Sequence, residues 1–227
     1  MAGSGARPPR AIVFDFNGTL SNDEPLLSRI YVELMGSAGR PLTDSMYRRE
    51  LAGNTDERIF GSWLGLAESS ARVAELTRER IARYCELAAD GSTIGHEVRE
   101  AVRLAAEHVP VAVGSGAARA EIVPALAAAG LGAVVTTIVA AYDVVRGKPD
   151  PETYRLVVAE LAAQSGAPLD PADVLAFEDT PAGIAAATRA GLHCIAIRGT
   201  VADNRLAAAE TIVEGITPAL IAQLLNV

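Results

Sequence analysis

The chain has 227 residues, half of them hydrophobic, and a formal net charge of −8. This is enough for one large globular domain, or for a domain that carries an insertion. The sequence holds no cluster of Lys and Arg and no apolar run of about 18 residues, which argues against a nucleic-acid-binding protein and a membrane-spanning helix.

The predicted elements begin after residues 1–10, for which we expect irregular structure. This segment has no apolar stretch typical of a signal peptide, so we expect a cytoplasmic protein. A short buried strand follows over residues 11–16 and runs into a polar loop. Residues 24–90 then show helical patterns and no convincing strand.

Beyond residue 90 the predicted helices and strands alternate. In chain order they are a helix over 95–108, a strand over 109–115, a helix containing 120–131, a short apolar strand within 133–139, a helix from 151, a strand over 173–179, a helix from 181, a strand over 193–197 and a helix over 218–225. Such alternation predicts βαβ units and a parallel sheet. Residues 1–23 and 91–227 would form the sheet domain, and residues 24–90 would be an insertion after its first strand.

Polar side chains directly follow several predicted strands. They are Asp15, Ser115 and the pair Glu178 and Asp179, and Lys148, the only lysine of the chain, lies in the loop RGKPD. Parallel sheets gather ligands at the carboxyl ends of their strands, so we expect these side chains to converge. Carboxylate oxygens suit Mg²⁺, whereas a lysine and helix N-termini suit phosphate. Taken singly, each residue also has a structural explanation, such as a helix N-cap or a solvated loop.

With these motifs the sequence resembles the haloacid dehalogenase superfamily over about residues 10–215. The family's DxDGT motif corresponds to Asp15-Phe16-Asn17-Gly18-Thr19, its Ser/Thr motif to Ser115, its Lys-Pro motif to GKPDPETY and its acidic motif to FEDTPAGIAAATRAGL. The helical insertion is similar to the branch of β-phosphoglucomutase-like and phosphoglycolate-phosphatase-like proteins. The resemblance implies an α/β fold with a Rossmann-like parallel sheet and an inserted α-helical cap domain.

The resemblance also implies roles for these residues. Asp15 would be the nucleophile that forms an aspartyl phosphate, and Lys148 would neutralise charge beside it. Mg²⁺ would be held by the carboxylates of Asp15 and Asp179 and the main-chain carbonyl of Asn17, with Glu178 in contact or one layer further out. The residues that would bind the substrate at the sheet edge are Gly18, Thr19, Ser115 and Gly116.

The implied function is that of a Mg²⁺-dependent phosphatase. Its substrate would be a small phosphomonoester, such as a sugar phosphate or an intermediate of specialised metabolism. We expect no nucleic-acid or membrane partner, and a monomer or weak homodimer.

The residue at position 17 departs from the family pattern. It is normally an Asp that protonates the leaving oxygen and then deprotonates the attacking water, and Asn can do neither. Losing such a group typically costs about 10²–10⁴-fold in rate. Asn17 therefore weighs against phosphomutase activity, and a phosphonate hydrolase would need a lysine in the cap, where residues 24–90 have none.

Two interpretations of Asn17 stay open. One is a phosphatase whose leaving group needs little help, or whose acid comes from elsewhere, such as Asp56 or Glu57. The other is a weak or inactive protein that binds a phosphorylated ligand. A deliberately introduced Asp-to-Asn substitution would give the same sequence.

The cap stretch RRELAGNTDERIF holds the candidate specificity residues. Gly53-Asn54 is a turn signal, and Asn54 or Thr55 would cap the next helix. By the resemblance this turn points toward the phosphate, so Asn54, Arg49 and Arg58 are candidate substrate-binding residues. The alternative is that both arginines lie on solvated helix faces.

Overall fold

The computed structural model describes residues 7–227, so residues 1–6 of the expected irregular segment lie outside the described residues. Its centre is a sheet with strand order β3-β2-β1-β4-β5-β6, in which every neighbouring pair is parallel. The strands are β1 (Ala11–Phe14), β2 (Val111–Gly114), β3 (Thr137–Val139), β4 (Val174–Glu178), β5 (His193–Ile197) and β6 (Thr211–Val213). The predicted Rossmann-like α/β fold is confirmed.

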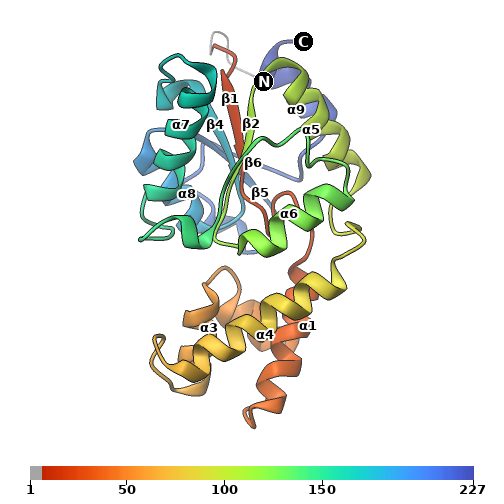
Figure 1. The fold of residues 1–227 in the computed structure, drawn as a ribbon, viewed down its shortest axis with the longest axis vertical. Helices are drawn as coiled ribbons and strands as arrows, with labels where there is room; N and C mark the ends of the chain where they lie inside the picture. The colour runs from red at the N-terminus through yellow and green to blue at the C-terminus, as the bar shows by residue number, and fades with distance from the viewer. Residues whose placement is uncertain (1–6) are drawn as a thin grey trace.

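Helices cover both faces of the sheet and make a three-layer domain (Figure 1). One face carries α7 (Glu152–Ser165) and α8 (Pro181–Ala190), and the other carries α5 (His96–His108), α6 (Arg119–Ala128) and α9 (Pro218–Leu225). Short 3₁₀ turns are η2 (Ala141–Asp143), η3 (Pro171–Asp173) and η4 (Asp203–Arg205). The central strand β1 is apolar throughout because alternate side chains enter opposite cores: Ile12 and Phe14 face one core, and Ala11 and Val13 face the other.

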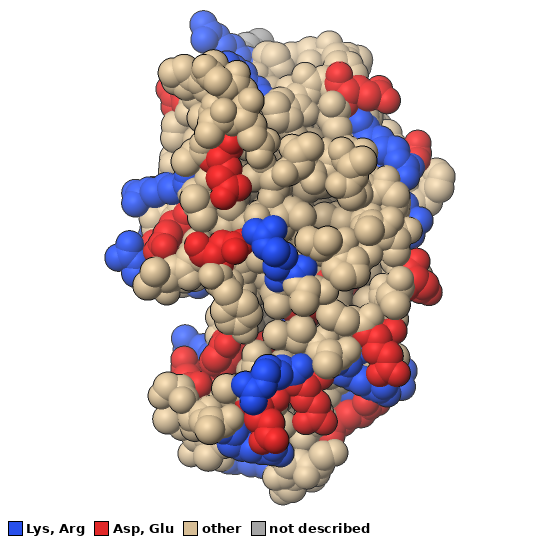
Figure 2. Space-filling model, viewed as in Figure 1, with Lys and Arg blue, Asp and Glu red and all other residues tan. Residues whose placement is uncertain are grey.

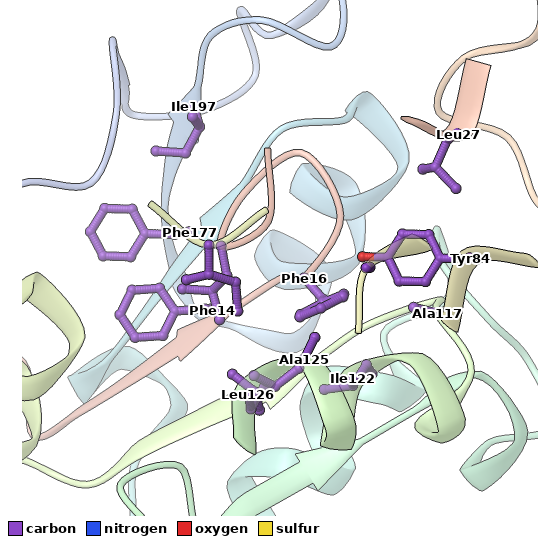
Figure 3. Packing of buried hydrophobic residues seen from close by; sticks show 14 of the residues in the cluster. Phe14, Phe16, Leu27, Tyr84, Ala117, Ile122, Ala125, Leu126, Phe177 and Ile197 are labelled. Atoms are coloured by element: carbon purple, nitrogen blue, oxygen red, sulfur yellow. The ribbon is translucent and has the colours of Figure 1, made fainter. Parts of the chain in front are cut away.

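Aromatic packing joins the two central strands. The rings of Phe14 and Phe177 stack with centroids 5.3 Å apart and planes 9° from parallel, and the two residues are register partners. Figure 3 shows Phe16, two residues further on, directed toward Ile122 and Ala125 of α6. The start of the loop that follows β1 is therefore held in place by close packing in the apolar core.

The elements between β1 and α5 are all helical. They are α1 (Glu24–Ser37), α2 (Asp44–Met46), the π-helical turn η1 (Tyr47–Leu51), α3 (Asp56–Leu64) and α4 (Ala71–Leu87). Figure 1 shows them as a separate lobe, which we call the helical lobe (residues 24–90) and propose as the cap domain. The ring of Tyr31 lies in its interior. The ring centroid of Tyr47 is 5.2 Å from that of Tyr31, and the ring centroid of Phe60 is 5.4 Å from it.

The structure differs from the sequence prediction mainly at short strands. Strand β6 was not predicted, because Thr211–Val213 is a three-residue, partly exposed edge strand with no alternating pattern to detect. Strands β1 and β3 are shorter than expected: β1 ends at Phe14, and residues 132–134 form a turn before β3 begins at Thr137. Over residues 7–227, none of the helices combines the length and apolarity needed to cross a bilayer.

Candidate active site

The register of the central strands sets the position of the site. Phe14 pairs with Val113 on one side and Phe177 on the other, and the N–H of Asp15 donates to the Phe177 carbonyl at 2.9 Å. The residues that follow the three strands therefore emerge at one edge. The strand order also reverses at β1, which is where parallel α/β sheets open a crevice for ligands.

Lys148 ties two of the predicted carboxylates together. Its Nζ donates to Asp15 Oδ1 at 2.6 Å and also to Glu178, whose Oε1 accepts a second bond from the Tyr154 hydroxyl at 2.6 Å. The three charged side chains are at most 10% exposed. Burial alone would lower the pKa of the Lys148 ammonium, but the two carboxylates outweigh it and raise that pKa above its usual value.

The donor set at this edge fits a divalent cation. Carboxylate oxygens of Asp15, Glu178 and Asp179 lie within 4.8 Å of one another, and all three residues are buried. Burial, reinforced by the other two carboxylates, raises the pKa of Asp179 well above its usual value. One lysine offsets only part of this charge, and closely spaced oxygen ligands are what Mg²⁺ prefers.

The loop after β1 needs glycine at position 18. Gly18 has φ +71°, and a Cβ there would overlap the Asp179 carboxylate. Thr19 Oγ1 donates to Asp179 Oδ1 at 3.5 Å, and Asn17 Nδ2 donates to Asp23 Oδ2 at 2.8 Å. The backbone of this loop thus packs against the acidic cluster at Gly18, while the side-chain amide of Asn17 points to Asp23 instead.

Ser115 and Gly116 lie where an anion would meet helix α6. The Ser115 hydroxyl oxygen accepts the Ala117 N–H at 3.1 Å, and the space at the Gly116 Cα is open, with nothing within 4 Å of a Cβ placed there. Both residues lie just before α6 begins and line a cavity between the sheet domain and the helical lobe. Helix N-termini of this kind favour negative charge.

A cavity of about 310 Å³ separates these residues from the helical lobe. Figure 2 shows the surface indented where the two parts of the molecule meet. The sheet domain lines the cavity with Asp15, Asn17, Ser115, Gly116, Lys148, Asp179, Thr180 and Thr200. The helical lobe lines it with Glu24, Tyr31, Tyr47, Asn54, Asp56, Glu57 and Arg80. The turn at Gly53 closes it, since a Cβ there would lie 3.2 Å from Thr180 Cγ2.

The cap candidates divide into two groups. Asn54 lines the cavity and donates to the Leu51 carbonyl at 2.8 Å, and Thr55 is the N-cap of α3. Arg49 and Arg58 do not line it; both are exposed, and Arg49 bonds its neighbour Glu50. These arginines occupy outward helix faces, as the alternative interpretation expected, because Tyr47 and Leu51 take the inward face of η1 and Ile59 and Phe60 that of α3.

Among the buried polar groups that were not predicted, Asp23 and Arg80 connect the two parts of the molecule. Asp23 accepts hydrogen bonds from Asn17 and, at 2.6 Å, from the hydroxyl of Tyr84 on α4. Arg80, also on α4, forms ion pairs with Asp56 of the helical lobe and Glu121 of the sheet domain. One signal was available for Arg80: it interrupts the apolar face of α4, and a charge there indicates a buried partner.

Comparisons with known proteins agree with the geometry. The sequence model of the haloacid dehalogenase-like hydrolases matches residues 9–191. The chain is 30% identical over 210 residues to validoxylamine A 7'-phosphate phosphatase of Streptomyces hygroscopicus subsp. limoneus, covering 92% of this chain and 94% of that one. It is 31% identical over 196 residues to protein CbbY of Rhodobacter capsulatus, covering 82% and 84%.

The structural comparison gives the same grouping. The fold superposes with a TM-score of 0.78 and 25% identity on CbbY from Rhodobacter sphaeroides, in a crystal structure of an Asp-to-Asn mutant bound to xylulose-(1,5)bisphosphate, covering 92% of this chain and 95% of that one.

Proposed function

The chain belongs to the haloacid dehalogenase-like hydrolases and to their phosphoric monoester hydrolase class, and we propose that it cleaves a small phosphomonoester through an aspartyl phosphate on Asp15. One observation carries this proposal. The only lysine of the chain is bonded to Asp15 in a cavity that also exposes Ser115 and Gly116. A carboxylate nucleophile needs such a cation beside it, because phosphate and carboxylate repel each other.

The residues divide the work of phosphoryl transfer. An Asp15 oxygen attacks phosphorus while the Ser115 hydroxyl and the Gly116 N–H hold phosphoryl oxygens, and Lys148 offsets the charge. Asp15, Glu178, Asp179 and the main-chain carbonyl of Asn17 would hold Mg²⁺. When bound, Mg²⁺ supplies positive charge to the phosphoryl oxygens.

The cavity favours a substrate with one phosphate and a hydroxyl-rich body. Among the described residues that line it, the only basic ones are Lys148 and Arg80, and each is already bonded to two carboxylates. A second phosphate under the helical lobe would find no free cation. The hydroxyl and amide groups of Tyr142 and Asn54 remain to bind sugar-like hydroxyls. A relative named as a phosphatase of a 7'-phosphate supports this class.

A phosphate-release screen tests the proposal. Purified protein with Mg²⁺ is offered sugar, cyclitol and simple organic monophosphates, with EDTA-treated protein as the metal control. We expect release from at least one monophosphate, its loss with EDTA, and its loss in Asp15→Asn but not in Glu79→Gln, which changes an exposed carboxylate on α4. Tight binding of inorganic phosphate with no release from any compound would instead support the binding protein that Asn17 suggests.

A further inference from the structure

The proposed reaction requires a proton for the leaving oxygen, and the usual position cannot provide it. Asn17 carries an amide, and its Nδ2 is already donated to Asp23. Asp23 cannot donate this proton either. It is fully buried, does not line the cavity and accepts hydrogen bonds from Asn17 and Tyr84. The proton must come from another group that faces the cavity.

Among the described carboxylates that line the cavity, most are already occupied. Asp15 and Asp179 belong to the nucleophile and metal positions, and Asp56 accepts bonds from the Tyr31 hydroxyl and the Arg80 guanidinium. Two carboxylates without such partners remain, Glu24 and Glu57.

Glu24 is the better placed of the two. The loop after β1 folds back so that Asp23 contacts both the Asn17 side chain and the Gly18 N–H, at 2.8 and 3.3 Å. Glu24 is the first residue of α1 and directly follows Asp23, the residue that Asn17 contacts. Its Oε1 is buried and has no hydrogen-bond partner over residues 7–227, whereas Glu57 lies in the first turn of α3 and not next to the loop after β1.

The environment of Glu24 suits proton transfer near neutral pH. Burial raises the pKa of Glu24 to about 7. The Tyr47 hydroxyl and the Arg48 guanidinium oppose this rise, and the Asp23 and Asp44 carboxylates reinforce it. The other ionisable groups that line the cavity are Asp15, Tyr31, Asp56, Glu57, Arg80, Tyr142, Lys148 and Asp179. A carboxyl group with a pKa near the working pH can both give and regain a proton.

Building on the proposed function, we propose that Glu24 is the general acid and base of this enzyme, in the role that Asn17 cannot fill. In the first step Asp15 forms a bond to phosphorus, the bond to the leaving oxygen breaks, and protonated Glu24 gives that oxygen its proton, releasing an alcohol. In the second step ionised Glu24 takes a proton from water as the water oxygen bonds phosphorus. The aspartyl bond breaks, phosphate leaves, and Glu24 is protonated again.

The test compares Glu24→Gln with wild type on two substrates. One is the best alkyl phosphate from the screen, and the other is p-nitrophenyl phosphate, whose leaving group needs little protonation. We expect kcat for the alkyl phosphate to fall by about 10²–10⁴-fold. With p-nitrophenyl phosphate we expect a burst of one nitrophenol per enzyme followed by slow turnover, because the second step still lacks its base.

The pH profile separates a chemical role from a structural one. In wild type, kcat/KM for the alkyl phosphate should fall as the pH rises above about 7. This fall should be absent in Glu24→Gln, present in the matched control Glu57→Gln, and retained at a reduced rate in Glu24→Asp. Binding of inorganic phosphate and the unfolding midpoint confirm that Glu24→Gln has kept its site and fold.

The outcomes distinguish this inference from the proposed function. If wild type turns over but Glu24→Gln keeps both its rate and the alkaline fall, Glu24 is not the acid and the phosphatase proposal stands. Loss of the alkaline fall in Glu57→Gln instead would assign the role to that residue. If no phosphate is released by any protein, the proposed function itself has failed.

Discussion

The side-chain amide of Asn17 donates to the Asp23 carboxylate at 2.8 Å, and Asp23 is fully buried. Burial raises the pKa of Asp23, against the opposing hydrogen bonds of Tyr84, Ser21 and Asn17. An amide at position 17 is therefore the donor that the Asp23 carboxylate requires. A second carboxylate in its place would face Asp23 at hydrogen-bonding distance, and the two would repel each other unless they shared a proton.

This pair predicts that Asn17→Asp alone destabilises the fold. We expect the free energy of unfolding to fall by about 1–3 kcal/mol at pH 8, and by less at pH 5. The facing carboxylates would hold a shared proton more tightly in the folded than in the unfolded chain, so that stabilisation is present at low pH and lost as the pH rises. Denaturant unfolding at both pH values measures it.

The exchanged variant Asn17→Asp with Asp23→Asn is the control. It restores one amide and one carboxylate, so we expect stability close to wild type at both pH values. It also places a carboxyl group at position 17, where turnover of alkyl phosphates should rise. Equal stability of Asn17→Asp and wild type at pH 8 would show that the two side chains do not interact as described.

Lys148 should be costly to remove. Lys148→Met leaves the Asp15 and Glu178 carboxylates buried without their cation, and we expect a loss of about 3–5 kcal/mol in the free energy of unfolding. Added Mg²⁺ should recover part of this loss, because a bound cation stabilises the folded state alone. Unfolding curves with and without Mg²⁺ measure both effects.

Arg198 provides the comparison for Lys148. It also pairs with two carboxylates, Asp203 and Glu214, but its side chain is 40% exposed. Arg198→Met should cost far less stability than Lys148→Met, since water replaces the partners of an exposed pair. Similar costs for the two variants would contradict the burial argument.

Arg80 should couple the helical lobe to the sheet domain. Its side chain is 7% exposed, and its guanidinium bonds Asp56 on one side and Glu121 on the other. We expect Arg80→Met to destabilise by about 3–5 kcal/mol, and Arg80→Met with Glu121→Gln to cost less than the sum of the single variants. Hydrogen exchange of α4 and α6 should rise together in the single variant. Exchange confined to α4 would mean that the contact does not join the two parts.

The lack of a free cation under the helical lobe predicts selectivity against bisphosphates. We expect a sugar bisphosphate to bind more weakly than its monophosphate. The ratio of the bisphosphate KM to the monophosphate KM should fall at high salt, which screens the repulsion. Glu57→Arg, which puts a cation on the cavity wall, should narrow this ratio, while Glu79→Arg on the exposed face of α4 should not. KM values for the two compounds provide the measurement.

Most of the fold could be predicted from the sequence, because the patterns that mark strands and helix starts are local. The strand His193–Ile197 and the helices from residues 181 and 218 were predicted at their observed positions, since apolar runs and Thr-Pro helix starts mark them. Asp15, Ser115 and Glu178 could be grouped because parallel strands end at one edge.

The contacts between the two parts of the molecule could not be predicted in the same way. Asp23 and Tyr84 are 61 residues apart, and Arg80 and Glu121 are 41 apart. Each pair depends on how α4 packs against the loop after β1 and against α6, and nothing local in the sequence determines that packing. Glu24 escaped notice for a similar reason, because its burial comes from the helical lobe rather than from its own neighbours.

Lys148 carries the only lysine amine of the chain, and its side chain is 10% exposed. Amine-directed reagents attack an uncharged, accessible nitrogen, so Lys148 should be spared in the folded protein. Unfolding or loss of the Asp15 contact would release that nitrogen. A single added label, counted by mass spectrometry, would then act as an internal indicator of how many molecules in a preparation have an intact catalytic centre.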